Sequence, residues 1–209
     1  MKTFLFQGDS ITDANRDDEN EDNFGLGCGY ALLLASDFSR KYKDNFKFIN
    51  RGKSGDRITD VYARIKEDII NLKPDYMSIL IGVNDVSHEL TQACGVLPEK
   101  FEKIYSMLIE EVTQALPEIK IIIIEPFVLK GLHTTERWNE FSGEVKKMAD
   151  ASKRVAEKFG LKFVPLQSIF DEASADGDTR YWSVDGIHPT AAGHQIIKEE
   201  LAKAIADIL

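Results

Sequence analysis

The chain has 209 residues, of which 43% are hydrophobic, 29% charged and 10% aromatic, a composition typical of a soluble globular protein with one buried core. Its net charge is −9, and its 26 Lys and Arg residues are scattered along the chain, which argues against a nucleic-acid partner or an anionic membrane surface. No apolar run approaches the length of about 18 residues that a membrane span needs, and no signal-peptide pattern is visible. We therefore expect a single cytoplasmic domain over residues 1–209.

Short β-branched or aromatic runs alternate along the chain with amphipathic helical patterns. Strands are expected at 3–7, 46–50, 76–82, 119–125 and 161–166, where apolar residues fill both faces. Helices are expected at 29–42, 57–72, 98–116, 137–159 and 190–208. The alternation predicts an α/β fold with a mostly parallel five-stranded sheet, helices on both faces and right-handed crossovers.

Polar segments follow several of these strands. The first strand leads into GDS at 8–10, the second into NRGKSG at 50–55, and the third into GVND at 82–85, while DGIHP at 185–189 precedes the last helix. In an open parallel sheet the reactive site lies beyond the carboxyl ends of the strands. We therefore expect these four segments to meet at one edge of the sheet.

The four segments contain the groups that nucleophilic catalysis needs. A serine needs a base that accepts its proton, the base needs an acceptor that fixes its tautomer, and an acyl oxyanion needs preorganised donors. His188 could accept the proton of Ser10, and Asp185 could accept the other ring N–H of His188. The backbone N–H groups of Ser10 and Gly55, with the side-chain amide of Asn84, could surround the oxyanion.

Each of these residues also has a simpler interpretation. Ser10 could cap a turn, the pair at 84–85 could cap the next helix, and His188 could be an exposed loop residue. The presence of all four segments favours the catalytic interpretation, with Asp85 left to capping or to bracing its loop. His194, in the last predicted helix, is assigned to the surface or to packing.

In this order the segments resemble the four sequence blocks of the SGNH hydrolases, also called the GDSL family of esterases and lipases. The resemblance implies a flavodoxin-like three-layer α/β/α sandwich and a hydrolase that needs neither a metal ion nor a cofactor, because a triad needs only water. It also implies the residue roles: catalytic Ser10, Asp185 and His188, and an oxyanion hole of Ser10, Gly55 and Asn84. Gly52 follows the same strand as Gly55 and remains an alternative oxyanion donor.

The longer stretches GDSITDANR, LGCGY and DGIHPTAAGH look like the intracellular acetylxylan-esterase type of carbohydrate acetylesterase. This resemblance implies a small-molecule ester substrate, an acetylated carbohydrate such as a xylo-oligosaccharide. Trp138 and Trp182 are candidates to stack on a sugar ring, although Trp182 could equally fill the core. Alternatives are a lipase, lysophospholipase or thioesterase for longer acyl chains and, in another class, a non-catalytic carbohydrate-binding module on the same fold. Family relatives include monomers and oligomers, so a homo-oligomer is one of the states that the sequence allows.

Three other patterns are rejected as sites. GKS at 52–54 lacks the upstream glycine of a phosphate-binding loop, and the acidic stretch at 13–17 lacks the glycine and glutamate of a calcium loop. Cys28 and Cys94 have no metal-type spacing. We expect both to be free thiols.

Overall fold

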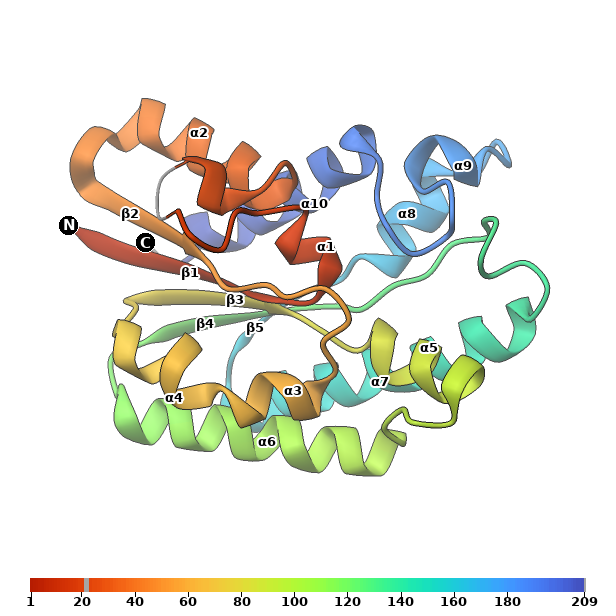
Figure 1. Cartoon of the computed structure of the whole chain (residues 1–209). Helices are drawn as coiled ribbons and strands as arrows, with labels where there is room; N and C mark the ends of the chain where they lie inside the picture. The colour runs from red at the N-terminus through yellow and green to blue at the C-terminus, as the bar shows by residue number, and fades with distance from the viewer. Residues whose placement is uncertain (21–22, 209) are drawn as a thin grey trace.

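The computed structural model describes residues 1–20 and 23–208. Within them, five parallel strands form one sheet in the order β2-β1-β3-β4-β5. The strands are β1 (Lys2–Gly8), β2 (Phe46–Asn50), β3 (Tyr76–Leu80), β4 (Lys120–Ile124) and β5 (Lys162–Val164). Helices cover both faces of this sheet (Figure 1), so the predicted three-layer α/β/α architecture and its five strands are confirmed.

The helices form two layers. On one face α2 (Tyr30–Tyr42) and α10 (Ala191–Ala206) pack against each other, with α1 (Ser10–Asp13), α8 (Gln167–Ala173) and α9 (Thr179–Trp182) at the same side of the sheet. The other face carries α3 (Ile58–Ala63), α4 (Ile65–Asp68), α5 (Val83–Gln92), α6 (Pro98–Ala115) and α7 (Trp138–Phe159). Short 3₁₀ turns occupy Asn23–Leu26, Lys43–Asn45 and Ile70–Leu72.

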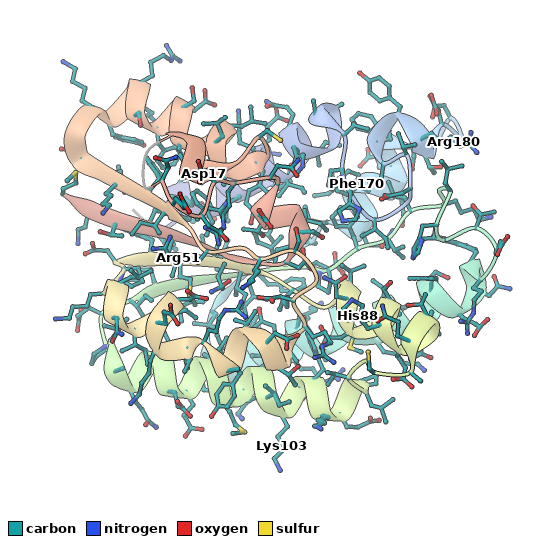
Figure 2. The ribbon with its side chains drawn as sticks, in the orientation of Figure 1. Asp17, Arg51, His88, Lys103, Phe170 and Arg180 are labelled. Atoms are coloured by element: carbon teal, nitrogen blue, oxygen red, sulfur yellow. The ribbon has the colours of Figure 1, made fainter. Side chains whose placement is uncertain are left out.

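The strands are apolar because both of their faces are covered. Every residue of β3 is buried, and the aromatic rings of Phe4, Phe6, Phe48 and Tyr76 contact one another on β1, β2 and β3. Such a doubly covered sheet has a continuous apolar pattern instead of an alternating one. On the outer face of α6, Lys103 points away from the sheet (Figure 2). No helix in the described ranges is long and apolar enough to cross a membrane.

The order of the strands reverses at β1. The chain passes from β1 to β2 on one side and later enters β3 on the other side of β1. At such a reversal the connections leave the sheet in opposite directions, which opens a crevice at the carboxyl ends of the strands. Ser10 lies two residues beyond the end of β1, so the topology places it at this crevice.

One predicted helix, and one of the simpler interpretations considered above, are wrong. The single helix predicted at 57–72 is interrupted at Arg64 and Ile69, which gives α3, α4 and a 3₁₀ turn. Ile58, Val61 and Ile65 are still buried at helical spacing, because the apolar pattern records the buried face and not unbroken hydrogen bonding. The pair at 84–85 is not a capping pair: Gly82 is the N-cap, and both residues lie in the first turn of α5.

Candidate active site

The turn after β1 presents Ser10. Gly8 has a φ of +156°, and a Cβ at this position would lie 2.3 Å from the carbonyl oxygen of Leu80 on β3, so glycine allows the chain to pass close to the neighbouring strand. Asp9 then caps α1, its carboxylate accepting the N–H of Ile11 at 3.0 Å. Ser10 is the first residue of α1.

Ser10, His188 and Asp185 form a hydrogen-bonded chain. Ser10 Oγ lies 2.8 Å from His188 Nε2, and His188 Nδ1 lies 2.6 Å from Asp185 Oδ2. A carboxylate only accepts, so His188 donates from Nδ1, and in the neutral ring Nε2 carries a lone pair that faces the Ser10 hydroxyl. In this geometry the serine proton can move to Nε2 as Oγ attacks an electrophile.

These contacts also set the pKa values of the pair. Burial raises the pKa of Asp185, but hydrogen bonds from the His188 ring and from the amides of Ile187 and His188 outweigh it and hold the pKa of Asp185 well below its usual range. The hydrogen bond to Asp185 and the charge of that carboxylate raise the pKa of His188. Asp185 is therefore ionised when His188 gains a proton.

The loop that carries Asp185 and His188 is fixed against the segment after β4. Gly186 has a φ of +95°, and a Cβ there would lie 2.4 Å from the carbonyl oxygen of Leu129. The N–H of Leu129 donates to Gly186 O at 2.8 Å, and the N–H of His133 donates to Asp185 O at 2.9 Å. Ser183 Oγ donates to His188 O at 2.8 Å. The loop is therefore held at Asp185, at Gly186 and at the histidine itself.

The structure distinguishes the two candidate glycines for the oxyanion hole. The buried N–H of Gly52 donates to Asn50 Oδ1 at 2.9 Å, so this donor is already used. Gly55 is exposed, and none of the described residues accepts its N–H. Asn84 donates one amide N–H to Asp56 O at 3.0 Å, which orients the side chain and leaves its second N–H available.

Hydrogen bonds tie the Ser10 turn to the loop that carries Gly55. Asp13 Oδ2 accepts the N–H of Ser54 at 2.9 Å and its Oγ–H at 2.7 Å. Asn50 Nδ2 donates to Thr12 O at 2.7 Å. Asp13, part of the rejected calcium pattern, thus fixes the position of the residue before Gly55.

The carboxyl groups of Asp9, next to Ser10, and of Asp85, next to Asn84, are both buried. Burial raises the pKa of Asp9 to about 7. Burial, with a smaller contribution from the charge of Asp9, raises the pKa of Asp85 to about 8. The N–H of Ile58 donates to the Asp85 carboxyl group, 3.2 Å from each oxygen. Of the two predicted roles for Asp85, bracing the loop is therefore the one that the structure shows.

A hollow of about 460 Å³ opens at Ser10 and His188. Asn15, Cys28 and His194 also line it. From the sequence we expected only a free thiol at Cys28 and a surface or packing role for His194. Cys28 and Cys94 are both free, as predicted. The only sequence signal for Cys28 and His194 was their position in the longer stretches LGCGY and DGIHPTAAGH.

The two tryptophans predicted to bind sugar do not line this hollow. Trp182 packs against the core, and its indole N–H donates to Ala173 O at 3.0 Å. Trp138 lines a separate hollow, with Lys130 Nζ 5.6 Å from its ring centroid. Of the two roles considered for Trp182, core packing is the one with observed contacts.

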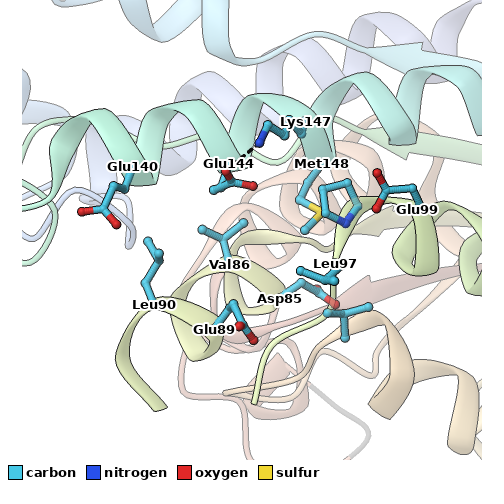
Figure 3. Close-up of a pocket in the computed structure, with 12 residues that line it drawn as sticks. Asp85, Val86, Glu89, Leu90, Leu97, Glu99, Glu140, Glu144, Lys147 and Met148 are labelled. Atoms are coloured by element: carbon cyan, nitrogen blue, oxygen red, sulfur yellow. Dashed lines mark hydrogen bonds and ion pairs between the residues drawn. The ribbon is translucent and has the colours of Figure 1, made fainter. Parts of the chain in front are cut away.

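A larger hollow, of about 530 Å³, lies between α5, the start of α6 and α7 (Figure 3). Its lining is apolar at Val86, Leu97 and Met148 and acidic at its edge, where Glu144 pairs with Lys147 at 2.7 Å. Of the described residues that line it, none is a serine, cysteine or histidine. Of these two hollows, the smaller one is lined by a serine hydroxyl and a histidine ring in hydrogen-bond contact.

Comparisons with known proteins identify the family of this chain. Residues 6–196 match the model of the GDSL-like lipase/acylhydrolase family. An acetylxylan esterase of Geobacillus stearothermophilus is 31% identical over 209 residues, which cover 96% of this chain and 92% of that protein. An isoamyl acetate-hydrolyzing esterase of Saccharomyces cerevisiae is 24% identical, with 97% and 85% covered.

Solved structures share the whole fold. A GDSL-like lipase from Parabacteroides merdae superimposes with a TM-score of 0.92 at 34% identity, covering 97% of this chain and 94% of that one. The acetylxylan esterase of Geobacillus stearothermophilus superimposes with a TM-score of 0.86 at 29% identity, with 98% and 94% covered. With a family match over most of its length and relatives that are esterases, this chain belongs to the GDSL-like lipase/acylhydrolase family and is a carboxylic ester hydrolase.

Proposed function

We propose that this protein is a serine esterase that removes acetyl and other small acyl groups from acetylated carbohydrates such as xylo-oligosaccharides. The observation that carries the proposal is the chain of contacts from Ser10 Oγ to His188 Nε2 at 2.8 Å and from His188 Nδ1 to Asp185 at 2.6 Å. It joins a nucleophile, a base and the group that orients the base.

In the first half of the reaction Ser10 Oγ attacks the ester carbonyl carbon while His188 Nε2 takes the hydroxyl proton. The N–H groups of Ser10 and Gly55 and the free amide N–H of Asn84 hold the oxyanion that forms. The tetrahedral intermediate collapses, the ester C–O bond breaks, and His188 gives its proton to the leaving alcohol oxygen. Asp185 stabilises the imidazolium in between.

In the second half, water attacks the acyl-Ser10 carbonyl and His188 accepts a water proton. The second tetrahedral intermediate releases the carboxylic acid, and His188 returns the proton to Ser10 Oγ. The balance is one ester and one water consumed, and one acid and one alcohol formed. The raised pKa of His188 strengthens its action as a base in both halves.

The relatives support this assignment in two ways. Structures of the acetylxylan esterase include variants described as catalytic in which a serine or an aspartate is replaced by alanine. The acetylxylan esterase and the isoamyl acetate-hydrolyzing esterase share the acetyl group and differ in the alcohol. A small acyl group is therefore the common element that we transfer to this chain, and acetylated carbohydrate follows the relative with the higher identity.

A lipase, lysophospholipase or thioesterase remains the second candidate, since the matched family includes lipases. Such an enzyme needs an apolar groove at the nucleophile, and the more apolar hollow of this protein lies away from Ser10, between α5 and α7. The non-catalytic alternative requires the loss of Ser10, His188 or Asp185, and all three are present and in contact. A cytoplasmic location remains a prediction from the sequence.

Acyl chain length separates the two enzymatic candidates. We expect kcat/KM to fall at least about tenfold from the acetate to the octanoate ester of 4-nitrophenol, because a chain that cannot enter keeps the carbonyl away from Ser10. We also expect acetate release from peracetylated xylose or xylobiose. A lipase would instead gain up to about 0.8 kcal/mol for each buried methylene. Equal or faster turnover of octanoate would assign the enzyme to the lipase side.

A further inference from the structure

The position of the smaller hollow indicates which part of the substrate it holds, provided that Ser10 and His188 act as proposed above. His188 Nε2 must deliver a proton to the leaving alcohol oxygen, so the alcohol lies on the histidine side of the scissile bond. His188, Pro189 and Ala191 line the hollow together with Ser10, whereas Gly55 and Asn84, two of the three proposed oxyanion donors, do not. The hollow is therefore the site of the alcohol.

His194 is a buried polar side chain that lines this hollow. It lies on the first turns of α10, six residues after His188, and is 9% exposed. Its ring stacks on Tyr30, with centroids 6.3 Å apart. Neither the proposed mechanism nor the hydrogen bonds of the triad use it.

The contacts of His194 fix its tautomer. The backbone N–H of Tyr30 donates to His194 Nδ1 at 3.2 Å, so Nδ1 carries a lone pair and the proton of the neutral ring is on Nε2. Burial, together with the charge of His188, lowers the pKa of His194 to about 4. The ring is therefore neutral at the pH at which His188 can act as a base.

The contacts of the His194 ring cover one of its edges and leave the other edge free. A Cβ added to Gly29 would lie 2.8 Å from His194 Cε1 and 3.0 Å from Nδ1, so the Nδ1–Cε1 edge is covered by the chain at 29–30. The edge that remains is the one with Nε2. Among the described residues, none accepts a hydrogen bond from Nε2.

The other polar side chains of the hollow already have partners. Ser54 Oγ donates to Asp13 at 2.7 Å, and Cys28 Sγ donates to Ala14 O at 3.1 Å. Asn15 Nδ2 lies 4.0 Å from Cys28 Sγ. None of the hydrogen bonds between described residues uses His194 Nε2–H, so this donor is available to a ligand that enters the hollow.

We infer that His194 Nε2–H donates a hydrogen bond to a hydroxyl oxygen of the alcohol part of the substrate, and that His194 thereby makes the enzyme selective for esters of polyhydroxylated alcohols. The acceptor is a hydroxyl that the alcohol keeps free near the esterified carbon. Simple alkyl esters leave the donor unpaired, so they bind less well both as substrate and in the transition state.

Two pairs of acetyl esters test this selectivity, because each pair differs only by a hydroxyl in place of a methyl group. They are 2-hydroxyethyl acetate with propyl acetate, and 3-hydroxypropyl acetate with butyl acetate. For the unmodified enzyme we expect kcat/KM, measured as acetate release, to favour the hydroxylated ester about tenfold in at least one pair. No preference in either pair would overturn the inference.

Two substitutions of His194 distinguish the role of Nδ1 from the role of Nε2. In His194→Asn the amide oxygen can replace Nδ1 as the acceptor for Tyr30 N–H, but nothing replaces Nε2–H, so the preference should fall to about one. In His194→Gln the amide N–H can reach the Nε2 position, so part of the preference should remain. A preference that survives in His194→Asn, or equal losses for both members of a pair, would show that His194 only packs.

Two further variants allow the result to be interpreted if His194→Asn does not fold or if the proposed function is wrong. In Gly29→Ala the new Cβ would lie 2.8 Å from His194 Cε1 and 2.8 Å from the Cβ of Ala14. We expect the His194 ring to shift, so the preference should fall even if His194→Asn does not fold, and a retained preference would contradict the inference. Ser10→Ala should lose activity on all four esters. If it does, and the preference does not depend on His194, only this inference fails; if Ser10→Ala stays active, the proposed function itself fails.

Discussion

The two hollows described above differ in size and in chemistry. The larger one, about 530 Å³ between α5 and α7, has apolar walls and paired carboxylates, whereas the smaller one, about 460 Å³, contains Ser10 and His188. Volume and apolarity would select the larger one as a ligand site. Reactive geometry selects the smaller one, because a nucleophile within 2.8 Å of its base is a much rarer arrangement than an apolar recess.

The difference has a topological cause. The smaller hollow lies at the carboxyl end of β1, where the order of the strands reverses, and the sheet brings reactive groups from distant parts of the chain to this place. The larger hollow lies between helices of one layer. Helices that pack against each other can leave a recess without any catalytic group.

The largest expected effect is the loss of activity when the nucleophile is removed from the smaller hollow. Ser10→Ala should lower kcat by about 10³- to 10⁶-fold with the fold intact, and His188→Ala should cost about as much, because triad residues act as a unit. The matched control is Leu97→Ala in the larger hollow, where the side chain is 61% exposed, and it should change kcat/KM less than about twofold. Steady-state kinetics with 4-nitrophenyl acetate measure both; the reverse order of effects would move the active site to the larger hollow.

A smaller loss of activity is expected when one of the proposed oxyanion donors is removed. Asn84→Ala removes one donor and leaves the nucleophile and the base in place, so kcat should fall by about 10²- to 10³-fold with little change in KM. Circular dichroism must show an intact fold, because Asn84 also donates to Asp56 O. A rise in KM at constant kcat would mean that Asn84 binds the substrate ground state instead.

The smallest of these effects is a shift in pH dependence. His188 acts as a base only when neutral, so kcat/KM should fall on the acid side about tenfold for each pH unit below its pKa. Asp185 raises this pKa, and the midpoint should therefore lie above the usual value of about 6.5. The pH profile of kcat/KM measures it. A midpoint below that value, or a flat profile to about pH 4, would argue against a histidine base paired with Asp185.

The sequence was sufficient for the fold and for the main contact at the site. Ser10 and His188 are 178 positions apart, yet their meeting could be predicted. Ser10 follows the first strand, and the DGIHP segment that carries His188 resembles the fourth sequence block of the SGNH hydrolases. The apolar runs indicated all five strands, because a sheet covered on both faces leaves a continuous apolar signal.

Local sequence patterns could not predict features of the site that depend on contacts between distant segments. The choice of Gly55 over Gly52 rests on the Asn50 side chain, which occupies the Gly52 N–H. The free edge of His194 rests on the Tyr30 N–H and on the closeness of Gly29. The sugar-binding role expected for Trp138 and Trp182 was argued from residue type alone, which does not say where a ring lies.

Covalent labelling tests the central claim most directly, namely that Ser10 is the nucleophile. A serine-directed phosphonate should inactivate the enzyme, and peptide mass spectrometry should find its added mass on the peptide that contains Ser10. Loss of the label in His188→Ala would further show that the base in contact with Ser10 activates it. Inactivation with the label on another serine, or full labelling of a Ser10→Ala variant, would contradict the account.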